Sequence, residues 1–134
     1  MIVVDTNVIG YLYLTSPHSD LSERALHNDP VWAAPRLWNS ELRNVLALYL
    51  RKKLLTLQSA LAIMDQTEML MQGFEYEVLS AHVLQLAQVS GCSAYDCEFV
   101  ALAQDLGVPL VTMDAALLRQ FPAIAVPLDV FVAG

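Results

Sequence analysis

Short apolar runs alternate with longer helical stretches along the chain, and this alternation restricts the fold more than any other feature. Strands are predicted at 2–4, 31–34, 76–78, 108–113 and 124–126, helices at 19–27, 35–53, 57–72, 80–90, 95–106 and 115–120, and an apolar segment at 8–14. Short buried strands that alternate with helices favour parallel pairing, with helices covering both faces of the sheet. The sequence therefore predicts an α/β fold.

Local signals suggest where several of these helices begin and end. Ser19 and Thr56 are predicted to cap helices, and Pro35 is predicted to lie in the first turn of the longest one. Gly91 and Gly107 follow two predicted helices at the position where glycine commonly ends a helix.

The composition is that of a folded single domain. The chain has 134 residues, of which 56% are hydrophobic and 16% charged, so global disorder is excluded. We expect one domain over residues 1–134. No run of about 20 apolar residues and no basic leader segment is present, so we expect a cytoplasmic protein that does not enter the membrane.

The apolar content is larger than one small core needs, which suggests an interface with a partner. Leu57, Leu61, Met64 and Met71 fall near one face of the predicted helix 57–72. That face could pack into the core or form a homodimer, and the sequence leaves both open.

The chain is acidic, with a formal charge of −7 from fourteen acids and seven bases. This charge argues against a broad basic face for nucleic acid, since phosphate contacts need Lys and Arg. An enzyme that meets phosphates through metal ions held by its own carboxylates remains possible.

Four acids are placed where they could meet. Asp5 and Asp114 directly follow the two best strands, and ligands of parallel sheets bind beyond the carboxyl ends of strands. Each could equally be an ordinary helix cap. Glu41 shares an apolar helix stripe with Trp38, Val45 and Leu48, and Asp96 shares one with Phe99, Val100 and Ala103, whereas Glu98 and Asp105 are predicted to be solvated.

Convergence of these four carboxylates would be costly without a counter-charge. Each pair about 5 Å apart costs roughly 3 kcal/mol at an effective dielectric of about 20. An all-oxygen ligand set with no nearby His or Cys indicates a hard divalent ion, most simply Mg²⁺, with Mn²⁺ possible.

The chain resembles the PIN-domain family, specifically the VapC-type toxin ribonucleases of prokaryotic toxin–antitoxin pairs. The resemblance covers nearly all of the sequence. It rests on four segments in this order: Ile2-Val-Val-Asp5-Thr-Asn7, Ser40-Glu-Leu-Arg-Asn-Val-Leu46, Ser93-Ala-Tyr-Asp96 and Leu110-Val-Thr-Met-Asp114.

The resemblance implies a three-layer α/β/α sandwich with a central, mostly parallel sheet. It also implies that Asp5, Glu41, Asp96 and Asp114 are the catalytic, metal-binding acids, with Asn7 and Thr112 orienting them. The implied reaction is Mg²⁺-dependent cleavage of RNA by activated water, leaving 3′-hydroxyl and 5′-phosphate ends. A VapB-type antitoxin would occupy an apolar groove and direct a basic group toward the acids.

Two other functions fit parts of the sequence. The first is a phosphotransfer or dehalogenase-like hydrolase with an Asp nucleophile after the first strand, but its D-x-D pattern is missing because position 7 is Asn. The second is a binding module without catalytic activity, whose acids merely cap helices.

The remaining polar residues give weaker indications. Arg51, Lys52 and Lys53 suit the end of a helix, and Arg36 is a better candidate for contacting a substrate because Glu41 lies in the same helix. The three histidines, His18, His27 and His82, show no metal-ligand spacing. Cys92 and Cys97 are expected to be one loop thiol and one buried thiol.

Overall fold

A five-stranded parallel sheet forms the centre of the molecule. The computed structural model describes all residues 1–134. Its strands are β1 (Ile2–Val4), β2 (Trp32–Pro35), β3 (Glu75–Tyr76), β4 (Leu110–Val111) and β5 (Ala125–Val126). They lie in the order β3-β2-β1-β4-β5, and every neighbouring pair is parallel. The predicted α/β class and parallel sheet are confirmed.

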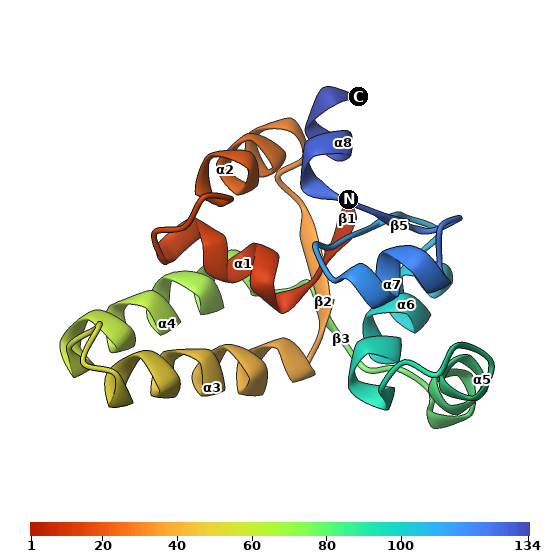
Figure 1. Ribbon diagram of the computed structural model, residues 1–134, viewed down its shortest axis with the longest axis horizontal. Helices are drawn as coiled ribbons and strands as arrows, with labels where there is room; N and C mark the ends of the chain where they lie inside the picture. Colours follow the sequence, from red (N-terminus) through yellow and green to blue (C-terminus); the bar gives the residue numbers. More distant parts are fainter.

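Eight helices cover this sheet. They are α1 (Thr6–Tyr13), α2 (Ser19–Asn28), α3 (Leu37–Arg51), α4 (Leu57–Met71), α5 (Ser80–Ser90), α6 (Ala94–Leu106), α7 (Ala115–Gln120) and α8 (Leu128–Ala133). Figure 1 shows α1 to α4 on one side of the sheet and α5 to α7 on the other. This arrangement is the three-layer sandwich that the resemblance implies.

The connections follow from the strand order. The chain steps from β1 to β2 to β3 through α1 to α4, and then returns across the sheet through α5 and α6 to β4. Parallel strands joined by right-handed crossovers place helices on opposite faces when the direction of winding reverses. The reversal occurs between β1 and β4, so their carboxyl ends flank the position where such sheets bind ligands.

The buried core lies on both faces of the central strands. All three residues of β1 are buried. The largest fully buried side chains of the core are those of Trp32, Trp38 and Phe99. On α6, Phe99, Val100 and Ala103 face this core, as predicted, because α6 packs against β1, β2 and β4.

Several helix ends agree with their predicted signals. The Thr56 hydroxyl accepts a hydrogen bond from the Ser59 amide, and Gly91 and Gly107 adopt left-handed conformations that end α5 and α6. Such conformations suit glycine because it has no Cβ.

Two predicted helix starts are wrong. Ser19 is the first residue of α2 rather than its cap, because its hydroxyl instead donates to the Leu14 carbonyl and accepts from the Ser16 amide. Pro35 ends β2 and does not begin α3, since the sheet continues through the Pro35–Tyr76 register pair.

The face predicted for α4 is only partly buried. Met71 is in the core, but Leu57 and Leu61 are 62% and 57% exposed, and the face that packs inward carries Ala60, Ile63 and Thr67 instead. Core packing is therefore wrong as the explanation of Leu57 and Leu61.

No helix is long and apolar enough to span a bilayer.

The terminal helix α8 is not predicted by the sequence. The segment contains the β-branched Val130 and Val132, which favour a strand locally. It forms a helix that contacts α2, as the upper part of Figure 1 shows.

The cap of α6 gives a test of local stability close to the predicted acids. The Ser93 hydroxyl accepts a hydrogen bond of 3.0 Å from the Asp96 amide. We expect Ser93→Ala to lower the free energy of unfolding by about 1 kcal/mol, because one amide of the first turn loses its partner. Ser40→Ala, at an exposed position inside α3, is the control and should not destabilise the protein in chemical denaturation. Equal effects of the two substitutions would contradict the role of this cap.

Candidate functional site

The structure brings the four acids predicted from the sequence to one recess. Asp5, Glu41, Asp96 and Asp114 line a cavity of about 210 Å³ beyond the carboxyl ends of the central strands. Its other lining residues are Thr6, Asn7, Asn44 and Val45. The recess lies where the winding of the sheet reverses, between the ends of β1 and β4. We call it the acidic recess.

Asp5 is the most constrained of these acids. Its side chain is buried, the whole residue is 7% exposed, and it caps α1. Oδ1 accepts a hydrogen bond from the Thr6 amide, and Oδ2 accepts one from the Thr112 hydroxyl, both at 2.7 Å. Thr112 Oγ1 in turn accepts from the Asp114 amide at 3.0 Å. Thr112 therefore fixes one acid directly and links it to the backbone of another.

Glu41 is held by a residue that the sequence reasoning missed. The Thr6 hydroxyl donates a 2.7 Å hydrogen bond to Glu41 Oε1 while the Thr6 amide binds Asp5. One threonine thus orients the carboxylate that follows β1 and the carboxylate on α3. The available signal was a hydroxyl residue directly after the first acid, but its partner lies 35 positions away and depends on the packing of α1 against α3.

The two remaining acids lie at helix starts. Asp114 caps α7 and accepts a 2.9 Å hydrogen bond from the Leu117 amide through Oδ1. Asp96 lies in the first turn of α6, and no protein group donates a hydrogen bond to its carboxylate. Capping therefore accounts for Asp5 and Asp114, as one interpretation of the sequence expected, but it does not account for Glu41 or Asp96.

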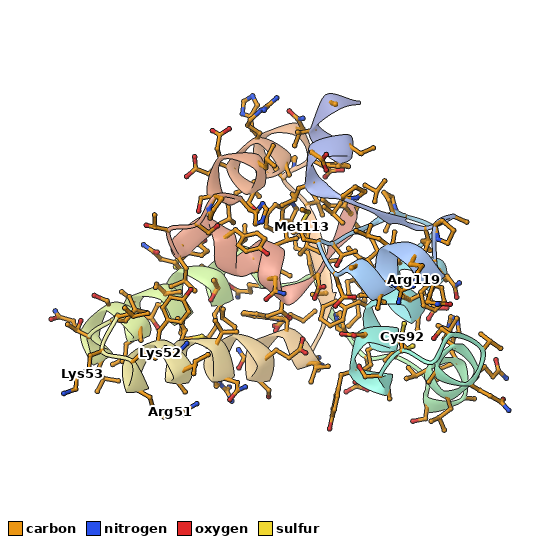
Figure 2. All side chains as sticks on the ribbon, in the orientation of Figure 1. Arg51, Lys52, Lys53, Cys92, Met113 and Arg119 are labelled. Carbon is orange, nitrogen blue, oxygen red and sulfur yellow. The ribbon has the colours of Figure 1, made fainter.

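No cationic side chain neutralises the recess. The three ion pairs of the structure join the amino terminus to Asp29, Arg36 to Glu77, and His82 to Asp105. None of the four acids takes part. Figure 2 shows that Arg51, Lys52 and Lys53 lie together at the outer end of α3, far from the start of that helix.

Burial and, to a smaller extent, mutual repulsion raise the pKa values of three of the acids, Asp5, Glu41 and Asp96. Burial raises the pKa of Asp5 from 3.8 to about 6, against the lowering effect of its hydrogen bonds, and the negative charges of Glu41 and Asp96 add to the rise. Burial also raises the pKa of Glu41, with contributions from Asp96 and Glu98. The pKa of Asp96 is raised by burial and by the charge of Asp114.

The chemistry of the recess fits a hard divalent cation. Its donors are carboxylate oxygens, and each ionised carboxyl retains lone pairs beyond the hydrogen bonds described above. No group of three or more His, Cys, Asp or Glu side chains is already arranged to hold an ion as it stands. Mg²⁺ is commonly bound through one or two carboxylates and several waters, so a pair of these acids would suffice for a first contact.

Several residues outside the four acids differ from their predictions. Glu98 was expected to be solvated, but it is half-buried because it lines a neighbouring recess between α5 and α6. Leu48 is 40% exposed, so the buried part of the apolar stripe of Glu41 ends before it. Asn44, one turn after Glu41, reaches the acidic recess and was not predicted to do so.

The minor residues agree more closely with expectation. Cys97 is buried and Cys92 is a half-buried thiol in the loop before α6. His82 does not contact any of the four acids, and its ring nitrogens face Gln104 and Asp105 on α6.

The raised pKa of Asp5 predicts how stability depends on pH without divalent ions. The folded protein keeps this proton up to about pH 6, whereas the unfolded chain loses it near 3.8. The folded state therefore binds more protons in this window, and stability should fall as pH rises through it, by about 3 kcal/mol in total. We expect Asp5→Asn to reduce this fall markedly, as measured by urea unfolding in EDTA at about pH 4.5 and about pH 7.5.

Asp65→Asn, at an exposed position on α4, is the matched control because it removes the same charge from the surface. An identical loss of stability with pH in the Asp5 and Asp65 variants would show that Asp5 is not protonated in the folded protein.

Comparisons with known proteins agree with this architecture. The family model described as PIN domain matches residues 2–122. The chain is 29% identical to Ribonuclease VapC3 of Pyrobaculum aerophilum over 129 residues, which cover 94% of this chain and 98% of the relative.

Three solved structures share the fold. PAE2754 from Pyrobaculum aerophilum superposes with a TM-score of 0.72 and 21% identity, covering 98% of this chain and 93% of the other. FitAcB from Neisseria gonorrhoeae gives 0.72 and 20%, covering 93% and 96%. FitAB bound to an IR36 DNA fragment gives 0.71 and 18%, covering 96% and 95%. With four acids gathered at the switch point of the sheet and a family model that spans most of the sequence, the chain belongs to the PIN domain family.

Proposed function

We propose that this protein is a Mg²⁺-dependent endoribonuclease and the toxin of a VapBC-type toxin–antitoxin pair. The observation that carries the proposal is the gathering of four carboxylates in one recess that no protein cation neutralises. The relative named Ribonuclease VapC3, which matches almost end to end, supports the same activity.

The four acids would hold the ion, and Mn²⁺ could replace Mg²⁺ there. When bound, a divalent ion polarises the scissile phosphate and makes a water molecule acidic enough to attack it. The chain supplies the orientation: Thr6 fixes Glu41 and Thr112 fixes Asp5, so that two carboxylates keep their directions when a substrate enters. Asn7 and Asn44 lie at the same recess, where their amides can donate hydrogen bonds to phosphate oxygens.

The chain also needs partners in this proposal. We expect a homodimer and a VapB-type antitoxin, and exposed apolar side chains such as Leu57 and Leu61 provide surface for such contacts. A small apolar pocket between α1 and α3, lined by Tyr11, Leu14 and Tyr49, adjoins the acidic recess through Thr6 and Asn7. The two free thiols fit a reducing cytoplasm.

The decisive test combines metal and RNA. We expect Mg²⁺ to raise the melting temperature of the protein, because the ion relieves repulsion among the acids. We also expect Mg²⁺ to support cleavage of single-stranded RNA into products with 3′-hydroxyl and 5′-phosphate ends, because the ion activates water. Asp96→Asn should abolish cleavage, whereas Asp65→Asn should cleave like the wild type. The readouts are differential scanning fluorimetry and gel analysis of labelled oligonucleotides.

Cleavage that persists in EDTA would eliminate the metal mechanism. A melting temperature indifferent to divalent ions, together with intact RNA, would favour a binding module. Cleavage of phosphate monoesters but not RNA would favour the hydrolase with an Asp nucleophile.

The threonine between two acids gives a second prediction. Thr6→Val removes the hydroxyl that orients Glu41 but keeps the size of the side chain, and we expect kcat for RNA cleavage to fall about 10- to 100-fold. Thr6→Ser should restore most of the rate because it returns the hydroxyl. Thr15→Val, on an exposed loop, is the control. Wild-type kcat in Thr6→Val would show that this hydrogen bond does not contribute.

A further inference from the structure

A second and larger recess lies beside the acidic one. It has a volume of about 440 Å³ and is formed by the end of β3, the start of α3, and helices α5 and α6. Arg36, Tyr76, Ser80, Leu84, Ala94 and Glu98 are among its lining residues. Its size is within the range of small-ligand sites. We call it the side recess.

The side recess and the acidic recess share two elements. Ala94 and Glu98 line the side recess, and Asp96, between them in the first turns of α6, lines the acidic recess. Arg36 directly precedes α3, and Glu41 follows five residues later, about 8 Å along the helix axis. Because the two recesses share these elements, an RNA chain bound at the four acids could extend into the side recess.

Arg36 is the only basic residue that lines either recess. Its partner is Glu77, with Nε 3.7 Å from Oε1, and the two side chains are 66% and 86% exposed. Such an exposed ion pair contributes little to the stability of the protein, so the Arg36 guanidinium can exchange Glu77 for another anion. Arg51 and the two lysines after it lie at the other end of α3 (Figure 2). At 1.5 Å per residue, the 15 positions from Arg36 to Arg51 correspond to about 22 Å along the helix axis.

The rest of the side recess suits a base more than a second phosphate. Five of its nine lining residues are apolar or aromatic, and Tyr76 and Ser80 provide hydroxyls. Nucleobases present flat faces that pack on such walls and polar edges that bind hydroxyls and carboxylates. Glu98, which is half-buried, would repel a phosphate from the interior, and this leaves the exposed rim at Arg36 for that group.

We propose that the side recess binds the nucleotide next to the scissile phosphate of a single-stranded RNA, with Arg36 contacting its phosphate and the walls of the recess receiving its base. This inference rests on the proposed ribonuclease function and adds a substrate-binding residue outside the four acids. It explains how an acidic protein with seven basic residues holds a polyanion near its carboxylates.

Arg36→Ala tests the phosphate contact, with Arg43→Ala as the matched control, since Arg43 is exposed on α3 and lines a different cavity with Asp65 and Glu68. With saturating Mg²⁺, we expect Arg36→Ala to raise KM for an RNA octamer about tenfold and to change kcat less than about twofold. The slope of log KM against log salt should fall by about 0.7, as for the loss of one phosphate contact on a single strand. Arg36→Lys should restore that slope.

Leu84→Ser tests the wall that receives the base. Leu84 is exposed, so the substitution should not unfold the protein. We expect KM to rise severalfold with an unchanged salt slope, because an apolar contact is lost and no charge is altered.

Binding of a fluorescein-labelled RNA octamer in EDTA, followed by anisotropy, separates this inference from the proposed activity. If Arg36→Ala binds the RNA octamer more weakly than the wild type does, but the wild type cleaves no RNA, the result supports RNA binding at the side recess and rejects the ribonuclease activity. If Arg36→Ala cleaves RNA with the KM of the wild type and with the same slope of log KM against log salt, the side recess does not bind the substrate, and the proposed ribonuclease activity stands. Absence of both binding and cleavage would reject both. If light scattering shows that Leu84→Ser separates a dimer, the side recess is an interface between copies and the inference is wrong.

Discussion

Four carboxylates gathered at one end of a parallel sheet, where burial penalises their charge and mutual repulsion adds to the penalty, are the constraint on which this molecule depends. Asp5 is the most buried of them and receives hydrogen bonds from Thr6 and Thr112, yet its pKa still rises to about 6. Burial outweighs those hydrogen bonds, and the neighbouring acids add to the cost. A fold that keeps such a group at the junction of its central strands gives up stability for a concentrated negative charge.

The surrounding structure directs that charge and does not neutralise it. Hydroxyl groups, backbone amides and helix starts orient the carboxylates, while the arginines and lysines lie elsewhere. This arrangement differs from a structural salt-bridge network, in which each acid would have a basic partner. It leaves the recess without a positive charge from the protein, which a small divalent ion could supply.

Much of this could be predicted from the sequence because its signals are local. Thr56, Gly91 and Gly107 mark helix ends through their own backbone and side-chain chemistry. The positions of Asp5 and Asp114 can be predicted because the carboxyl ends of parallel strands lie at one edge of the sheet. The hydrogen bond from Thr6 to Glu41 could not be predicted, since it depends on how α1 packs against α3. The prediction that Pro35 begins a helix is wrong because proline is compatible with both a strand end and a first helical turn, and Pro35 ends β2.

Calorimetric titration of the metal-free protein with Mn²⁺ at about pH 6, in buffers of different ionisation enthalpy, tests the central claim most directly. An ion that enters a recess with a half-protonated Asp5 must displace that proton, so we predict binding with release of roughly half a proton or more. Loss of this release in Asp5→Asn would identify its source. Binding without proton release, or no binding at all, would contradict the account.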